Sequence, residues 1–313
     1  MDFKRNIKTK SVIALVICAS LYTTWDVQGI WRTVDNNLPK EKQSNGDPFE
    51  EGWTAWGNRQ ELRKRILTAT CNDLHVSQRD ILERLMLAPD LHFRHLLVDE
   101  RNEVIYCYIP EIARDSWGTL WKSLTGESNN TSLSSLYQSH NTQKRTVLEE
   151  AKAKSSLRLK LMTYTKIIVV QHPFLRLLST YRDNVNKKPG DHYLQSAIAP
   201  SNSSLSWPEF VNFLTKGSGK MVDSLWKPYE ILCHPCAVEY DVVAKAETLR
   251  EDSERFLRRV GAPEGVHFPP DASDSSIQAN GALWNEYQEM LSEEQLDALR
   301  KAYQRDLKLF AYK

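Results

Sequence analysis

The chain has 313 residues, and its 41 lysine and arginine residues almost balance 40 aspartate and glutamate residues, for a formal net charge of +1. This balance argues against a protein that binds nucleic acid through bulk positive charge. Because 41% of the residues are hydrophobic and 26% are charged, with only 12 glycines and 13 prolines, the composition excludes disordered and fibrous chains and is typical of a globular protein with a large core.

The N-terminus combines a basic cluster with an apolar segment. Residues 1–10 contain four basic residues and one acidic residue, and residues 11–25 carry no charge. This pattern fits either a cleaved signal peptide or a short signal anchor that crosses a membrane once. We favour the anchor, because its basic flank would keep residues 1–10 in the cytosol as a tail and direct the rest of the chain into the lumen, a type II topology. Residues 26–57 have no clear period and are predicted to form a stem.

Glycosylation signals and cysteines are both compatible with a lumenal chain. Asparagine-linked glycosylation sequons occur at Asn129, Asn130 and Asn202, in segments rich in serine and asparagine. Apart from the cysteine in the apolar segment, the chain has an even number of cysteines, which could form two disulfides in three possible pairings. These disulfide candidates are Cys71, Cys107, Cys233 and Cys236. The CxxC pair among them could also belong to a redox or zinc site, but no second pair supports zinc, so we predict disulfides and no metal.

Helix and strand patterns alternate from residue 58 to the C-terminus. Helices are predicted over 59–70, 77–87 and 144–163, with further helices that begin near 115, after 173, and at the capping sequences near 206, 248 and 292. Strands are predicted over 95–98, 104–109, 166–171 and 238–244. Because strands alternate with helices, residues 58–313 are predicted to form one α/β domain with a mainly parallel central sheet flanked by helices.

Two strand-to-helix junctions in this domain are candidate ligand sites. One runs from the strand over 104–109 through Pro110 into a helix, and the other runs from the strand over 166–171 through His172 and Pro173. In an open α/β sheet, ligands bind at the carboxyl ends of the strands, where helix starts favour anions. Each junction alone is ordinary α/β architecture. A P-loop kinase is disfavoured, because the chain has no GxxxxGK[ST] sequence.

A series of short motifs points to a family. The motifs are Tyr106-Cys107-Tyr108-Ile109-Pro110, Trp117, Pro173-Phe174, Arg176-Leu177, Ser179, Tyr181-Arg182-Asp183, Trp226, Pro228, Leu232-Cys233, Pro235-Cys236, Tyr240-Asp241, Glu247-Thr248-Leu249, Asp252, Tyr303, Asp306, Leu309-Phe310 and Tyr312. Their order and spacing resemble those of the Golgi carbohydrate sulfotransferases that act on chondroitin, dermatan and related N-acetylgalactosamine-containing glycans. The resemblance runs from about residue 59 to the C-terminus.

The resemblance implies a P-loop-like sulfotransferase fold and a reaction. A sulfuryl group would pass from 3′-phosphoadenosine-5′-phosphosulfate to a hydroxyl of a chondroitin-like or N-acetylgalactosamine-terminated glycan, without a metal and without nucleic acid as a partner. The physics parallels phosphoryl transfer, in which positioning and cations stabilise charge on the leaving phosphate. The first junction would hold the 5′-phosphosulfate and the second the 3′-phosphate. The implied donor-binding residues are Pro110, Arg114, Ser116, Gln171, Arg176, Ser179 and Arg182, and the implied location is the Golgi membrane.

Three positions depart from the family pattern in chemically important ways. Glu111 and Gln171 replace an expected lysine and arginine, and Leu225 replaces the histidine expected to act as the base. A lost charge-assisted contact to a phosphate costs about 1.5–3 kcal/mol, and a lost general base costs about 10²–10⁴ in rate. His172 and His234 are the candidate substitute bases, and Arg114 could restore one cation. The alternative hypothesis is therefore a catalytically impaired relative that binds glycans or partners an active sulfotransferase.

Overall fold

The computed structural model describes residues 48–74, 82–83, 93–126, 147–186, 205–216, 223–269 and 274–313. The chain divides into two compact units, Met1–Glu51 and Gly52–Lys313, and the contacts described below belong to the second. The predicted anchor over 11–25, the three sequons and nearly all of the predicted helix over 77–87 lie outside the described residues. Within the described part, the chain has no helix that is both long enough and apolar enough to span a membrane.

The helices and strands follow one another in the order expected of an α/β protein. They are α3 (Pro48–Asp73), β1 (Leu96–Asp99), β2 (Val104–Cys107), α5 (Arg114–Thr125), α7 (Val147–Thr163), β3 (Thr165–Val170), α8 (Pro173–Thr180), the π-helix η2 (Tyr181–Asn186), α10 (Trp207–Lys216), α11 (Tyr229–Cys233), β4 (Val242–Lys245), the 3-10 helix η3 (Ala246–Thr248), α12 (Leu249–Arg259), α13 (Asp274–Glu289) and α14 (Glu293–Leu309).

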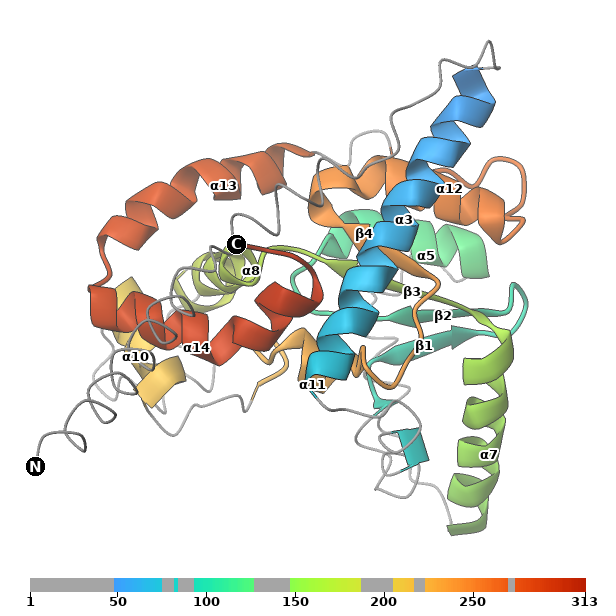
Figure 1. The fold of residues 1–313 in the computed structure, drawn as a ribbon, viewed down its shortest axis with the longest axis horizontal. Coiled ribbons are helices and arrows are strands. Elements are labelled where there is room, and N and C mark those ends of the chain that lie inside the picture. The colour runs from blue at the N-terminus through green and yellow to red at the C-terminus, as the bar shows by residue number, and fades with distance from the viewer. Residues whose placement is uncertain are drawn as a thin grey trace, which may run out of the picture. The chain divides into compact units, whose positions relative to one another are not determined.

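The four described strands form one sheet in the order β1-β2-β3-β4 (Figure 1). The pairs β2–β3 and β3–β4 are parallel, and β1 is an antiparallel edge strand joined to β2 by a short turn. The mainly parallel sheet is therefore confirmed. Strands β2 and β3 are buried almost throughout, which explains why both read as continuous apolar runs in the sequence.

Side chains of α3 cover the outer edge of β4. The backbone N–H of Val243 donates to Gln60 Oε1 at 2.9 Å, and Arg63 Nη1 donates to the Val243 carbonyl at 2.7 Å. The fully buried Asp252 of α12 accepts hydrogen bonds from Trp56, Gln60 and Arg63 of α3. This network shows that the predicted stem over 26–57 is too long: α3 already begins at Pro48, and Trp56 is only 3% exposed.

Two groups of helices complete the core. On one side of the sheet, Trp117 of α5 stacks on Tyr106 of β2 with ring centroids 4.8 Å apart and donates to Ser253 of α12 at 3.1 Å. Beyond β3, the helices α8, α10 and α14 enclose a second apolar cluster that includes Trp207, Trp226 and Tyr303. Figure 1 shows these three helices and α13 grouped together. Phe174, Leu177 and Leu178 anchor α8 in this second cluster.

Two predictions on either side of β4 are wrong, one about where the strand begins and one about a helix cap. The predicted strand over 238–244 begins only at Val242, because residues 234–238 form a turn in which the N–H of Val238 donates to the His234 carbonyl. Thr248 precedes α12 as predicted but does not cap it, because its hydroxyl donates to Asp252 and accepts from Arg63. By contrast, the predicted capping box of Ser292 and Gln295 at α14 is confirmed.

Candidate functional site

The first junction runs from the end of β2 to the start of α5. Glu111 and Ala113 have left-handed backbone conformations, with φ of 69° and 45°, which are uncommon for residues other than glycine. Ala113 is the N-cap of α5, and no described side chain caps this helix start. The first bond of the helix joins the N–H of Trp117 to the Ala113 carbonyl at 2.8 Å. Because the N–H groups before that bond lack carbonyl partners, the start of α5 is suited to bind an anion.

The second junction lies beside the first, since β2 and β3 are parallel neighbours. His172 is the N-cap of α8, and its Nδ1 accepts a hydrogen bond from the backbone N–H of Phe174 at 3.2 Å. Gln171 is buried, and its backbone carbonyl accepts a hydrogen bond from the Tyr229 hydroxyl at 2.8 Å. The resemblance implies that these two loops bind opposite ends of the sulfate donor. In the structure, both loops lie at the same edge of the sheet.

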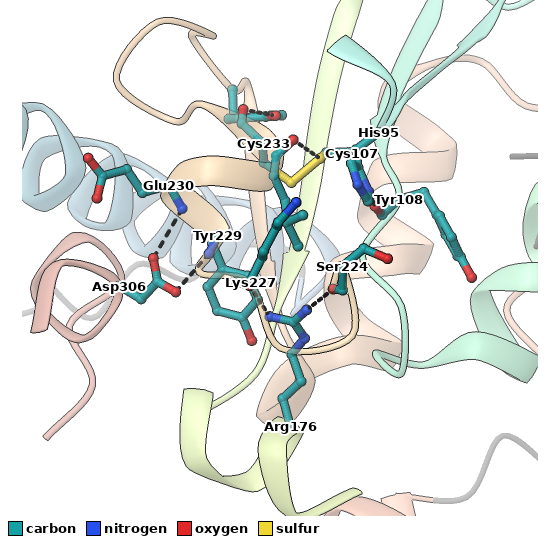
Figure 2. Close-up of a disulfide and its surroundings, with 12 residues drawn as sticks. His95, Cys107, Tyr108, Arg176, Ser224, Lys227, Tyr229, Glu230, Cys233 and Asp306 are labelled. Atoms are coloured by element: carbon teal, nitrogen blue, oxygen red, sulfur yellow. Dashed lines mark hydrogen bonds between the residues drawn. A yellow bond between two sulfur atoms is a disulfide. The ribbon is translucent and has the colours of Figure 1, made fainter. Parts of the chain in front are cut away.

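Arg176 connects the two junctions. Its side chain is almost fully buried, and its guanidinium donates to three carbonyl oxygens. The partners are Pro110 at 3.4 Å and Lys227 and Ser224, each at 2.7 Å. Figure 2 shows the bonds to Lys227 and Ser224. The guanidinium carbon also lies 5.1 Å from the centre of the Tyr229 ring. Arg176 thus fastens the segment that contains Leu225 to the loop after β2, and in this structure it faces protein carbonyls.

The remaining predicted donor-binding residues lie along the same two helices. Ser179 is buried on α8, and its hydroxyl donates to the Leu175 carbonyl at 3.1 Å. Arg182 is half-buried in the π-helix η2 that continues α8. Ser116 is half-buried in the first turn of α5, while the side chain of Arg114 lies outside what the structure describes. The predicted movement of Arg114 into the loop therefore stays a prediction.

Comparison with known proteins identifies the origin of this arrangement. A model of the sulfotransferase family matches residues 94–313, which include every described strand and both junctions. The chain belongs to the sulfotransferase family. This confirms the family expected from the motifs and the sulfotransferase type of α/β fold.

Individual relatives that resemble the chain are carbohydrate sulfotransferases. Carbohydrate sulfotransferase 14 of Mus musculus is 30% identical over 231 residues, which cover 67% of this chain and 58% of that protein. Carbohydrate sulfotransferase 11 of Rattus norvegicus is 28% identical over 273 residues, covering 80% of this chain and 75% of that protein. The chain thus spans a little under three fifths of the first relative's length. No solved structure matches the chain.

The two histidines predicted as substitute bases differ in how firmly they are held. Both ring nitrogens of His172 are engaged, Nδ1 with the N–H of Phe174 and Nε2 with the Lys313 carbonyl at 2.9 Å. Burial also lowers the pKa of His172. His234 is half-buried at the end of α11 in a left-handed conformation, with its ring 5.9 Å from that of Phe93. His172 is therefore placed as a helix cap, and the assignment of either histidine as a base stays a prediction.

The four predicted cysteines form two disulfides, and the structure supplies the pairing that the sequence left open. Cys71 of α3 is bonded to Cys236, and Cys107, the last residue of β2, is bonded to Cys233 of α11. The second disulfide lies beside the site, as Figure 2 shows. It holds the strand that leads to the first junction against the segment that carries His234.

Two residues near the site carry buried ionisable groups whose placement the sequence did not indicate. His95 is 7% exposed, and its Nδ1 lies 2.7 Å from the Tyr108 carbonyl; burial lowers its pKa to about 4. Asp306 of α14 accepts hydrogen bonds from the backbone N–H groups of Tyr229 and Glu230 at 2.7 and 3.1 Å, and burial raises its pKa to about 7. Asp306 belongs to the motifs that the sequence singled out, but the partners of both residues are backbone groups elsewhere in the sequence, so these contacts could not be predicted.

Proposed function

We propose that the protein is a carbohydrate sulfotransferase that uses 3′-phosphoadenosine-5′-phosphosulfate to sulfate a hydroxyl of an amino-sugar-containing glycan. One observation carries the proposal: in a chain of the sulfotransferase family, an uncapped helix start at the end of β2 opens beside a second strand-to-helix junction at the end of β3. The names of the relatives support a carbohydrate as the acceptor.

The residues of the two junctions would divide the donor between them. Backbone N–H groups at the start of α5, with Ser116, would bind the 5′-phosphosulfate, and the Ser179 hydroxyl would bind the 3′-phosphate. The acceptor hydroxyl oxygen would form a bond to sulfur as the bond from sulfur to the 5′-phosphate oxygen breaks, with the hydroxyl proton passing to a base. Because Leu225 cannot accept a proton, His234 is the candidate base. The reaction would release 3′-phosphoadenosine-5′-phosphate and the sulfated glycan.

The proposed location follows from the N-terminal pattern and not from the described residues. A span over 11–25, with residues 1–10 in the cytosol, would place the catalytic domain in the lumen of the Golgi apparatus. The sequons at Asn129, Asn130 and Asn202 would then be available for glycosylation. Treatment of the secreted or membrane-bound protein with an asparagine-specific glycosidase would test this location, since an unchanged mass would contradict it.

A direct assay tests the activity. The full chain, incubated with donor carrying labelled sulfate, is expected to transfer label to at least one glycan in a panel of chondroitin, dermatan and N-acetylgalactosamine-terminated acceptors. The matched control is His234→Ala, which should reduce the rate about 10²–10⁴-fold while donor binding is kept. No transfer to any acceptor, combined with no binding of 3′-phosphoadenosine-5′-phosphate by calorimetry, would reject the proposal. Binding without transfer would indicate the catalytically impaired relative instead.

A further inference from the structure

Positive charge gathers around the carboxyl end of β2. Besides burial, the charges of Arg176, Lys227 and His234 each lower the pKa of His95, against the opposing effect of its hydrogen bond to Tyr108. A buried histidine surrounded in this way reports a local positive potential at the point where the first junction begins.

Lys227 is the member of this group whose charge is not used by the fold. Its side chain is half-buried, and its ammonium makes no hydrogen bond or ion pair with the described part of the chain. By contrast, the buried Lys166 is paired with Asp241 at 3.0 Å, and the half-buried Lys160 is paired with Glu100. An ammonium held in a partly buried position without an anion is available for a ligand that carries one.

The backbone of Lys227 is fixed beside the first junction. Its N–H donates to the Asp223 carbonyl at 3.0 Å, and its carbonyl accepts from the same Arg176 guanidinium that donates to Pro110. Arg176 thereby links residue 227 to Pro110, which lies in the loop between β2 and α5. In Figure 2 the Lys227 side chain is drawn between the Arg176 guanidinium and the Cys107–Cys233 disulfide.

The loop itself lacks a described cation for an anionic ligand. Glu111 contributes a carboxylate, and the guanidinium of Arg176 donates to three carbonyls. Backbone N–H groups at a helix start attract an anion but do not neutralise a phosphosulfate, whose transfer leaves additional charge on the phosphate. We propose that Lys227 supplies the positive charge that neutralises the donor phosphate, by binding the phosphosulfate end of the donor from outside the loop. This inference rests on the proposed function and extends it to a specific donor-binding residue.

The test uses two nucleotides that differ only at the end that Lys227 is proposed to contact. In the full chain, Lys227→Met should weaken binding of 3′-phosphoadenosine-5′-phosphate about 10- to 100-fold, measured by calorimetry. It should leave the affinity for adenosine 3′-monophosphate, which lacks the 5′-phosphate, unchanged within about twofold. Because Arg176 binds the carbonyl oxygen of residue 227, the substitution keeps that hydrogen bond. An unchanged thermal midpoint verifies that the variant is folded.

Two further variants complete the design. Lys216→Met removes an exposed lysine that pairs with Glu294, and it should leave the affinity for both nucleotides unchanged. Adding Glu111→Lys to Lys227→Met should recover most of the lost affinity, because it returns one positive charge to the same junction. If Lys227→Met weakens the binding of both nucleotides equally, or weakens the binding of neither, the inference is overturned while the proposed function stays in place. Failure of the unmodified chain to bind 3′-phosphoadenosine-5′-phosphate would reject the proposed function and this inference with it.

Discussion

At the scale of the residue, Arg176 shows how one side chain can hold two loops of a candidate site together. A guanidinium offers five N–H donors and cannot lose its charge under ordinary conditions. Three of the hydrogen bonds that it makes here end on carbonyls of two separate loops, and the Tyr229 ring lies close by. The motif Arg176-Leu177 was assigned to donor binding from the resemblance, and the contacts indicate that the arginine also holds both loops in register.

This reading predicts a large effect of Arg176→Met on stability. The methionine would fill part of the space but would leave the carbonyls of Ser224 and Lys227 without their described donor, so the free energy of unfolding should fall by about 3 kcal/mol or more. Denaturant titration of the full chain would measure the change. Arg300→Met, which removes an exposed partner of Asp297, is the control and should cost less than about 0.5 kcal/mol. Equal effects of the two variants would contradict this account of Arg176.

At the scale of the element, α14 is tied to the site through one carboxylate. Asp306 accepts from the first two N–H groups of α11, and Tyr229 of α11 donates from its hydroxyl to the Gln171 carbonyl at the second junction. The C-terminal helix therefore sets the position of α11, and α11 sets the loop after β3. Buried carboxylates without a cation in direct contact favour their protonated form, which explains the raised pKa of Asp306.

The raised pKa predicts a pH dependence of stability. Because the folded state holds the Asp306 proton up to about pH 7, whereas an unfolded carboxyl releases it near 3.8, the contribution of this group is full below about pH 4 and is lost as the pH rises to about 7. The free energy of unfolding of the unmodified chain relative to Asp306→Asn should decrease over this window, by at most about 1.4 kcal/mol per pH unit. Urea titrations at several pH values would measure it. A difference that stays constant from pH 4 to 8 would refute the prediction.

Elements with a local signal were predictable from the sequence. The apolar runs of β2 and β3 and the Ser292 capping box at α14 were all found, because burial and capping leave a pattern within a few neighbouring residues. The start of α3 was missed, since residues 48–57 have no clear helical period. Their helix is stabilised instead by the bond of Trp56 to Asp252, which is 196 residues away.

The site was predictable to a similar degree. Its location at two adjacent junctions followed from α/β topology, and the four disulfide-forming cysteines followed from their even number. The pairing of those cysteines, the hydrogen bonds of Arg176 to carbonyls and the burial of His95 depend on contacts between distant segments, so no local pattern reveals them. The effects of Glu111, Gln171 and Leu225 on activity stay predictions.

At the scale of the whole molecule, the two disulfides close loops of 165 and 126 residues in sequence but constrain different parts of the fold. Cys71–Cys236 joins α3 to the turn after α11, and Cys107–Cys233 joins the end of β2 to α11 itself. In the chain-entropy model, long loops of this kind each contribute about 4–5 kcal/mol to stability. The two disulfides should therefore contribute similarly to the free energy of unfolding but differ in their effect on the candidate site.

Paired alanine variants separate these roles. Cys71→Ala with Cys236→Ala should lower the free energy of unfolding by about 4 kcal/mol and leave the affinity for 3′-phosphoadenosine-5′-phosphate within about twofold. Cys107→Ala with Cys233→Ala should lower the free energy of unfolding by a similar amount. It should also weaken binding of the nucleotide, because β2 leads directly into the first junction. Denaturant titration and calorimetry measure both effects in each variant. Nucleotide affinity that changes equally in the two double variants would contradict the assignment of Cys107–Cys233 to the site.

The hydrogen bonds from Gln60 and Arg63 to Val243 have a practical consequence for producing the protein. They occupy the outward-facing backbone groups of an edge strand, which would otherwise be a template for another strand. A shortened chain that begins after α3 would leave this edge of β4 bare and remove three partners of the buried Asp252 at the same time. Such a fragment should self-associate through β4, so expression of a soluble domain has to start before Pro48 even though the family match begins at residue 94.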